Sequence, residues 1–237
     1  MLKTEISHSK SISHRAEKIW NWTTAAGKIR VERRAQLLVK AAKMVPADIV
    51  LELGCGTGIF TEKIFNLTGS HITALDISPE MIRIAKEKNI LADFTVADAT
   101  QSGFPDNNFD VVFGSSVLHH LEIREAIKEL YRVLKPGGTI YFTEPNLLNP
   151  CVFFLMKVPF IRKLSKISPD ETAFLRWKLF KQLKETGFKD IELVPIDFLH
   201  PLTPPALISL VQKIGLIAEN TPLLKEFAGS IFIKAKK

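Results

Sequence analysis

The sequence contains little cysteine, and this scarcity excludes one class of fold. Only two cysteines, Cys55 and Cys151, occur in 237 residues, so the chain has no framework of disulfides. The N-terminal residues also lack the apolar core of a secretory signal and carry charges and serines instead. We therefore expect the protein in the reducing cytoplasm.

Signals for nucleic-acid binding are missing as well. The chain has no internal repeat, no low-complexity tract and no arginine-rich run with interleaved aromatic residues. Its 32 basic and 25 acidic residues leave a net charge of +7, which favours acidic partners such as phosphorylated substrates, nucleic acid or an anionic membrane surface without choosing among them. Because the nucleic-acid signals are missing, small-molecule or lipid partners are favoured over nucleic acid.

What is present fits one α/β domain, because 46% hydrophobic and 24% charged residues are ordinary for a globular chain of this length. Short apolar segments predict strands at residues 49–53, 72–75, 94–97, 109–114, 139–143, 190–195 and 230–235. Ser78 and Pro79 are typical of a helix start, and Gly187 of a helix end.

The segment VLELGCGTG, residues 50–58, joins a buried strand to three alternating glycines, and a helix is predicted to follow at 59–67. Glycine permits positive φ and close approach of a ligand, to which the helix start presents free N–H groups. A tight turn alone would also explain three glycines, because short glycine motifs often match by chance. The more specific interpretation is a nucleotide-type site.

Acidic residues recur at the ends of the predicted strands. Asp76, Asp98 and Glu144 each follow or end such a strand. Because ligands bind outside the carboxyl ends of the strands in open α/β sheets, these acids are expected to face one site. An acid at position 76 lies beside the glycine loop and can accept hydrogen bonds from both hydroxyls of a ribose.

Several motifs occur together with these features. They are ELGCGTG at 52–58, DISPEM at 76–81, VADA at 96–99, FPDNNFD at 104–110, LHHL at 118–121 and LKPGG at 134–138. Over residues 46–144 the chain thereby resembles the class I S-adenosylmethionine-dependent methyltransferases. The third glycine comes one residue earlier than in G-x-G-x-x-G, so NAD binding ranks below S-adenosylmethionine.

The resemblance implies an α/β, Rossmann-like class I methyltransferase fold. Its seven-stranded, mostly parallel sheet would have helices on both faces, a substrate cap, and a last strand that is antiparallel and lies beside the fifth. One methyltransferase domain would span residues 1–237: an N-terminal helical lid at 1–45, the S-adenosylmethionine-binding core at 46–145, a cap insertion at 146–172, and the C-terminal part of the sheet at 173–237.

The resemblance also implies S-adenosyl-L-methionine as cofactor and S-adenosyl-L-homocysteine as product. Asp76 would bind the ribose, Ile77 would pack on the adenine ring, and Asp98 with the Ala99 N–H would read the adenine edge. The predicted cofactor contacts are Glu52, Gly54, Cys55, Gly56, Gly58, Asp76, Ile77, Asp98, Ala99 and Ser115. No metal site is predicted.

His119 and His120 follow the strand at 109–114, close to where the sulfonium methyl should point. A histidine there is suited to deprotonating a hydroxyl or amine, because its ordinary pKa lies near 6.5. Packing is the commoner role for a histidine. We expect only one of the adjacent pair to face the site, and the family pattern favours His120 as the catalytic residue.

The N-terminal part is predicted to be mobile at 1–13 and helical at 14–45, with a break at Gly27. Trp20 and Trp22 are either core anchors or the aromatic face of a lid that excludes water. Residues 145–170 are apolar but interrupted by Pro150, Lys157 and Pro159, which excludes a spanning helix of about 20 apolar residues.

That apolar insertion is expected to determine the substrate. It is either a helical cap over the active site or, through residues 147–166 with their basic rim, a peripheral contact with the inner face of the membrane. The predicted function is methyl transfer from S-adenosylmethionine to a small-molecule, sugar or lipid-linked acceptor by direct in-line displacement. The alternatives are an RNA methyltransferase and a non-catalytic S-adenosylmethionine-binding scaffold.

Overall fold

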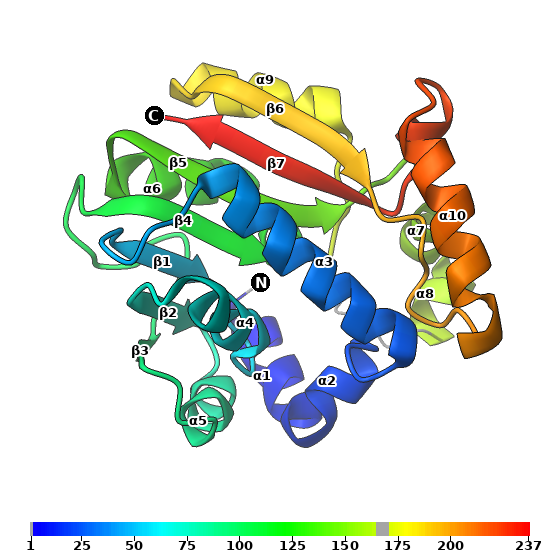
Figure 1. Cartoon of the computed structure of the whole chain (residues 1–237). Helices are drawn as coiled ribbons and strands as arrows, with labels where there is room; N and C mark the ends of the chain where they lie inside the picture. The colour runs from blue at the N-terminus through cyan, green and yellow to red at the C-terminus, as the bar shows by residue number, and fades with distance from the viewer. Residues whose placement is uncertain (1, 165–170) are drawn as a thin grey trace.

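A computed structural model describes residues 2–164 and 171–237. The fold is built on one seven-stranded sheet of order β3-β2-β1-β4-β5-β7-β6 (Figure 1). The strands are β1 Val50–Leu53, β2 Ile72–Asp76, β3 Ala92–Val96, β4 Phe109–Ser115, β5 Leu134–Pro145, β6 Lys189–Ile196 and β7 Ser230–Lys236. Strand β7 is antiparallel and lies between β5 and β6, as predicted.

Helices cover both faces of the sheet. They are α1 Leu2–Ile12, α2 Ala16–Ile19, α3 Ala25–Ala42, α4 Ile59–Thr68, α5 Pro79–Glu87, α6 Ile123–Val133, α7 Pro150–Lys157, α8 Pro159–Leu164, α9 Arg176–Thr186 and α10 Ile208–Glu219. Short 3-10 turns complete the set: η1 Ser13–Arg15, η2 Leu118–His120, η3 Pro205–Leu207 and η4 Leu224–Phe227. The expected Rossmann-like α/β architecture, a seven-stranded and mostly parallel sheet with helices on both faces, is confirmed.

The alternation of side chains along the central strands fills a core on each face. On β4, Val112 packs in the cluster that includes α6 and α9, whereas Val111 and Phe113 pack in the cluster that includes α3 and α4. Successive residues of a strand point to opposite faces, so strands buried on both faces are apolar at nearly every position. This explains why the sequence shows them as short continuous apolar runs.

The N-terminus differs from the prediction of a mobile segment at 1–13, because residues 2–12 form α1. Ile12 at its end is buried with Ala16 and Met81 of α5, and this apolar contact fixes the segment on the body of the protein. Residues 14–45 are also not one helix broken at Gly27. A turn at residues 20–24 separates α2 from α3. Gly27 lies in the first turn of α3, where its N–H donates to Thr24 Oγ1 over 2.9 Å.

Candidate active site

A large cavity, about 820 Å³, lies at the carboxyl ends of the parallel strands. Its floor includes the loop after β1, and its walls include residues of α1, α3 and α7. Ligand pockets in proteins are usually about 300–1,000 Å³. The cavity volume therefore lies in the upper part of that range, and the cavity is at the edge of the sheet where ligands bind in open α/β folds.

The glycine loop needs its glycines for conformation. Gly54, Gly56 and Gly58 have φ of +66°, +52° and +78°, a region that side chains with a Cβ rarely adopt. A Cβ at Gly56 would also lie 3.2 Å from the Trp20 ring, which approaches the loop from the N-terminal segment. Because the glycines have no side chains, a ligand in the cavity can reach the backbone of the loop.

Asp76, at the end of β2, is tied to this loop. Its Oδ2 accepts the Gly56 N–H over 2.8 Å, and its Oδ1 accepts the Ser78 N–H over 2.9 Å. The carboxylate therefore holds two backbone segments in place while it lines the cavity beside Ile77. This double role was not foreseen, because the prediction considered only the ribose.

Two further strand ends contribute polar groups. Asp98 Oδ1 accepts from both the N–H and the hydroxyl of Thr100, over 2.8 and 2.7 Å. Ser115 Oγ lies 2.7 Å from Thr143 Oγ1. Of the ten predicted cofactor contacts, eight line the cavity, namely Gly54, Cys55, Gly56, Asp76, Ile77, Asp98, Ala99 and Ser115.

The other two predicted contacts, Glu52 and Gly58, are not in the cavity lining. Glu52 is buried behind the loop, where it accepts the Thr61 hydroxyl over 2.5 Å. Burial, with the nearby Asp76 charge, raises the pKa of Glu52 to about 8. Burial also raises the pKa of the Cys55 thiol, so this cysteine stays protonated in the loop.

His119 and His120 both line the cavity, which corrects the expectation that only one of them would face it. The 3-10 turn η2 brings the two rings to a centroid distance of 4.1 Å. His119 Nδ1 lies 2.7 Å from Glu144 Oε2, and Glu144 Oε1 also accepts the N–H groups of Val117 and Leu118. Such a carboxylate fixes the ring and favours a proton on Nδ1, which leaves Nε2 as the basic nitrogen.

Comparisons with known proteins decide the family. A family model described as "Methyltransferase domain" matches residues 51–142. An uncharacterized methyltransferase-like protein of Schizosaccharomyces pombe is 31% identical over 174 residues, 72% of this chain and 65% of that protein. A demethylmenaquinone methyltransferase of Chlorobaculum parvum is 32% identical over 184 residues, 67% of this chain and 74% of that protein. The chain belongs to the class I S-adenosylmethionine-dependent methyltransferases.

Solved structures agree on the fold of this methyltransferase. An S-adenosylmethionine-dependent methyltransferase from Mesorhizobium loti aligns with a TM-score of 0.64 at 17% identity, over 87% of this chain and all of that one. Its family membership, shown by the family model and the relatives, makes the protein an enzyme of the S-adenosylmethionine-dependent class. The cavity fits such a cofactor, since the loop exposes glycine backbone and the acids Asp76 and Asp98 lie in the same lining.

One group of side chains in the methyltransferase has the spacing of a metal site, although none was predicted. Ligand atoms of His119, His120 and Glu171 all lie within 4.8 Å of one another. Imidazole and carboxylate are suitable ligands for several divalent transition metals. The His119 ring is already held by Glu144, an arrangement that orients metal-bound histidines as well as catalytic ones.

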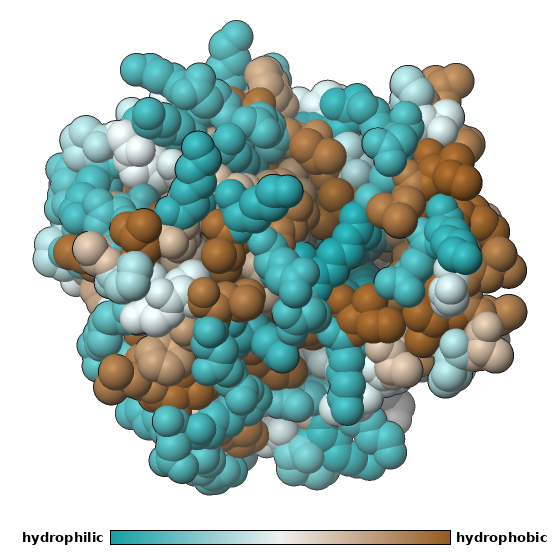
Figure 2. All heavy atoms as spheres, viewed as in Figure 1, coloured by the Kyte–Doolittle hydropathy of each residue, from teal (hydrophilic) through white to brown (hydrophobic). Residues whose placement is uncertain are grey.

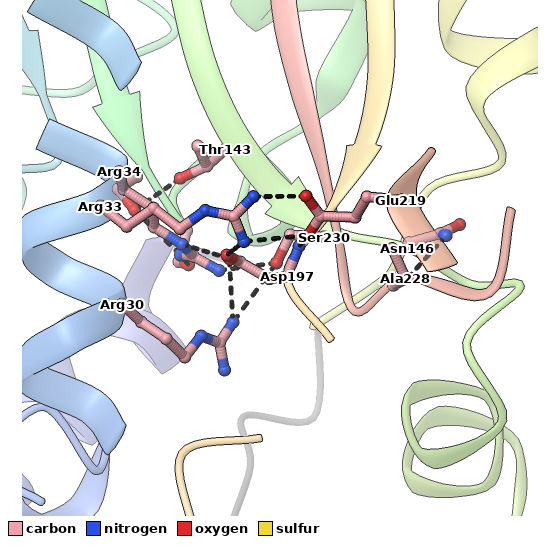
Figure 3. Close-up of polar contacts among 11 residues, drawn as sticks. Arg30, Arg33, Arg34, Thr143, Asn146, Asp197, Glu219, Ala228 and Ser230 are labelled. Atoms are coloured by element: carbon pink, nitrogen blue, oxygen red, sulfur yellow. Dashed lines mark hydrogen bonds and ion pairs between the residues drawn. The ribbon is translucent and has the colours of Figure 1, made fainter. Parts of the chain in front are cut away.

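An arginine cluster was missed by the sequence reasoning. Arg30, Arg33 and Arg34 of α3 surround Asp197, which follows β6, and Figure 3 shows their side chains meeting at this one carboxylate. Arg30, Arg34 and Asp197 line the methyltransferase cavity. The sequence signal was the spacing of Arg30 and Arg34, because residues four apart lie on the same side of a helix.

Proposed function

We propose that this enzyme transfers the methyl group of S-adenosylmethionine directly to a small-molecule, sugar or lipid-linked acceptor and releases S-adenosylhomocysteine. The observation that carries the proposal is the continuity of the cavity, whose lining includes both the glycine loop and Val152, Phe154 and Leu155 of the apolar helix α7. An acceptor that packs against α7 would therefore lie in the same cavity as the cofactor. The sulfonium is itself a good leaving group, so alignment and exclusion of water are the main requirements, and orientation can contribute about 7–11 kcal/mol.

The His119–Glu144 pair is suited to the proton transfer that a hydroxyl or amine acceptor requires. Nε2 of His119 would accept the acceptor proton, while the buried Glu144 stabilises the resulting imidazolium. His120, favoured by the sequence, lies beside it, with Nε2 3.9 Å from a Glu171 oxygen. We assign His119 as the base and His120 as the residue that contacts the acceptor.

An apolar acceptor is favoured by the cap and by a relative. The Chlorobaculum parvum relative is named a demethylmenaquinone methyltransferase, and its match covers 74% of that protein. The cavity here is walled on the cap side by Phe154, Met156 and Ile161. Leaving this apolar wall exposed to water would be unfavourable, so we expect the acceptor to carry an apolar portion that covers it.

We also propose peripheral membrane contact through the described part of residues 147–166; residues 165 and 166 lie outside the described residues. Phe153, Phe154 and Phe160 are 45%, 53% and 73% exposed, beside Lys157. Figure 2 shows hydrophobic surface at the right, over α10, and Figure 1 places α7 and α8 behind that helix. Among the described residues, no helix is long and apolar enough to cross a membrane.

The central experiment is an acceptor screen with methyl-labelled S-adenosylmethionine. Aqueous and lipid fractions of a cell extract are incubated with the enzyme, and labelled product and S-adenosylhomocysteine are measured. Label in a lipid or small-molecule fraction is expected. Binding of S-adenosylmethionine without S-adenosylhomocysteine release from any fraction would identify a scaffold, and label confined to RNA would overturn the acceptor class.

Sedimentation with vesicles tests the membrane contact. Vesicles with anionic lipid should retain the protein more than neutral vesicles, because the exposed Lys157 lies among the apolar side chains of this segment. Phe160→Ser should weaken retention, whereas Leu91→Ser, which removes an exposed apolar side chain elsewhere, should not. Equal retention of wild type and Phe160→Ser would refute the contact.

A further inference from the structure

The arginine cluster has one more positive charge than negative. Arg33 pairs with Glu219 through both Nη atoms, at 2.9 and 2.5 Å, and Arg34 Nε donates to Asp197 over 2.8 Å. Arg30 reaches Asp197 and Ser230 only through Nη2, at 3.4 Å in each case. Three guanidinium groups therefore share two carboxylates, and Arg30 makes the longest contacts (Figure 3).

Arg30 is incompletely satisfied inside the protein. Its Nε is buried and has no hydrogen-bond partner among the described residues, and its side chain is only 12% exposed. Burial, and then the neighbouring Arg34 charge, lower the pKa of Arg30 to about 10. A buried cation with an unmet donor is costly, so its retention at a cavity wall indicates a ligand that completes it.

The position of Arg30 lies on the acceptor side of the cavity. The predicted cofactor acids lie at the ends of β2 and β3, and Ser115, another predicted cofactor contact, ends β4. Ser230, which anchors Arg30, begins β7, two strands beyond β4 in the sheet. Arg34 bridges the two strand ends, because its Nη1 donates to Ser115 Oγ over 3.2 Å and its Nη2 donates to Ser230 Oγ over 2.6 Å, whereas Arg30 contacts Ser230 and not Ser115. His200, Phe198 and Leu199 lie in the same part of the lining.

We propose that Arg30, supported by Arg34, binds a carboxylate or phosphate group of the methyl acceptor. The inference rests on the proposed function and narrows its acceptor to an anionic molecule with an apolar portion. Asp197 and Ser230 accept hydrogen bonds from Nη2 of Arg30 alone, so its other guanidinium N–H groups would bind the anion. The charge of the anion, with those of Asp197 and Glu219, would balance the three arginines.

Titration with short amphiphiles tests this subsite. Octyl phosphate, octanoate, neutral octanol and inorganic phosphate are titrated into the enzyme with S-adenosylhomocysteine at saturation, so that the cofactor carboxylate is already bound. At least one octyl anion should bind ten times more tightly than octanol. Binding of inorganic phosphate alone as tightly as octyl phosphate would indicate a free phosphate rather than an amphiphile as the source.

Arg30→Met should lose that tenfold preference and keep its affinity for S-adenosylmethionine. The matched control is Arg33→Met, which removes a charge from the same helix but not from the cavity lining, and it should keep the preference. Because Arg30 is the surplus cation, the melting temperature of Arg30→Met should not fall below that of wild type, whereas Arg33→Met should melt earlier.

Two results would overturn the inference. One is equal anion binding by wild type and Arg30→Met. The other is a loss of S-adenosylmethionine affinity in Arg30→Met while the affinity for 5′-methylthioadenosine is unchanged. Because 5′-methylthioadenosine has no carboxylate, that result would mean that Arg30 binds the carboxylate of the cofactor. Absence of S-adenosylmethionine binding to the wild type would instead overturn the proposed function itself.

Discussion

Replacing Asp76 by alanine tests the placement of the cofactor most directly. The carboxylate accepts the N–H groups of Gly56 and Ser78, at 2.8 and 2.9 Å, and we propose that it also accepts hydrogen bonds from the ribose hydroxyls. A hydrogen bond to a charged group contributes about 1.5–3 kcal/mol. Loss of one such ribose contact alone would weaken S-adenosylmethionine binding at least tenfold, because 1.4 kcal/mol is one decade of affinity.

The anchored loop makes the expected loss larger than the ribose contacts alone. Without the carboxylate, the Gly56 N–H has no acceptor at that position and the loop loses its link to the end of β2. Asp76→Asn keeps an oxygen acceptor and lacks the charge, so its affinity should fall between those of wild type and Asp76→Ala.

Isothermal titration with S-adenosylmethionine measures these affinities, and circular dichroism checks that each variant is folded. Asp93→Ala is the matched control, because Asp93 is an acid of the neighbouring strand whose side chain is 75% exposed and outside the cavity lining. Wild-type affinity in folded Asp76→Ala would refute the cofactor placement.

Three further predictions concern other parts of the site. The folded pKa of Glu52, about 8, exceeds its ordinary 4.5, so the folded state holds a proton that the unfolded state releases between these values. Stability should therefore fall as pH rises through this window, by up to about 1.4 kcal/mol per pH unit, and chemical denaturation of Glu52→Gln should show no such contribution. His119→Asn should lower kcat by about 10²-fold or more and leave the dissociation constant of S-adenosylmethionine unchanged in titration; an unchanged kcat would remove the histidine from the chemistry. Gly27→Ala should lower the melting temperature markedly, because its Cβ would lie 1.9 Å from the Asn21 carbonyl oxygen, and a melting temperature equal to that of wild type would contradict this geometry.

Local chemistry made much of the fold predictable from the sequence. Ser78 caps α5 with Pro79 after it, and Gly187 ends α9 at a φ of +114°. Gly54 and Gly56 of the glycine loop and the strand-end acids Asp76 and Asp98 line the cavity as expected, because strand, turn and helix start are adjacent in the chain, whereas the third strand-end acid, Glu144, is buried behind His119 and does not line it. Such features depend on a few neighbouring residues, so their patterns can be recognised without a structure.

The features that escaped prediction depend on residues distant in sequence. Glu52 belongs to the recognised motif, yet whether its side chain reaches the cavity depends on packing against α4. The pairing of His119 with Glu144 and the balance of charges around Asp197 join segments that only the folded sheet brings together. Helix α1 was missed because its stabilising contact, Ile12 with Met81, is also long-range.

The arginine cluster has a consequence for the order of folding. Its contacts join residues 30–34 to Asp197, Glu219 and Ser230, separations of 163 to 200 residues. Contacts of such separation form late, since the intervening chain must first be ordered. During synthesis, the glycine loop can therefore form around β1 and β2 before Arg30, Arg33 and Arg34 have met Asp197, Glu219 and Ser230. A chain that ends before β7 would hold the cofactor loop but would lack Ser230 and the contacts of Arg30 and Arg34 with it.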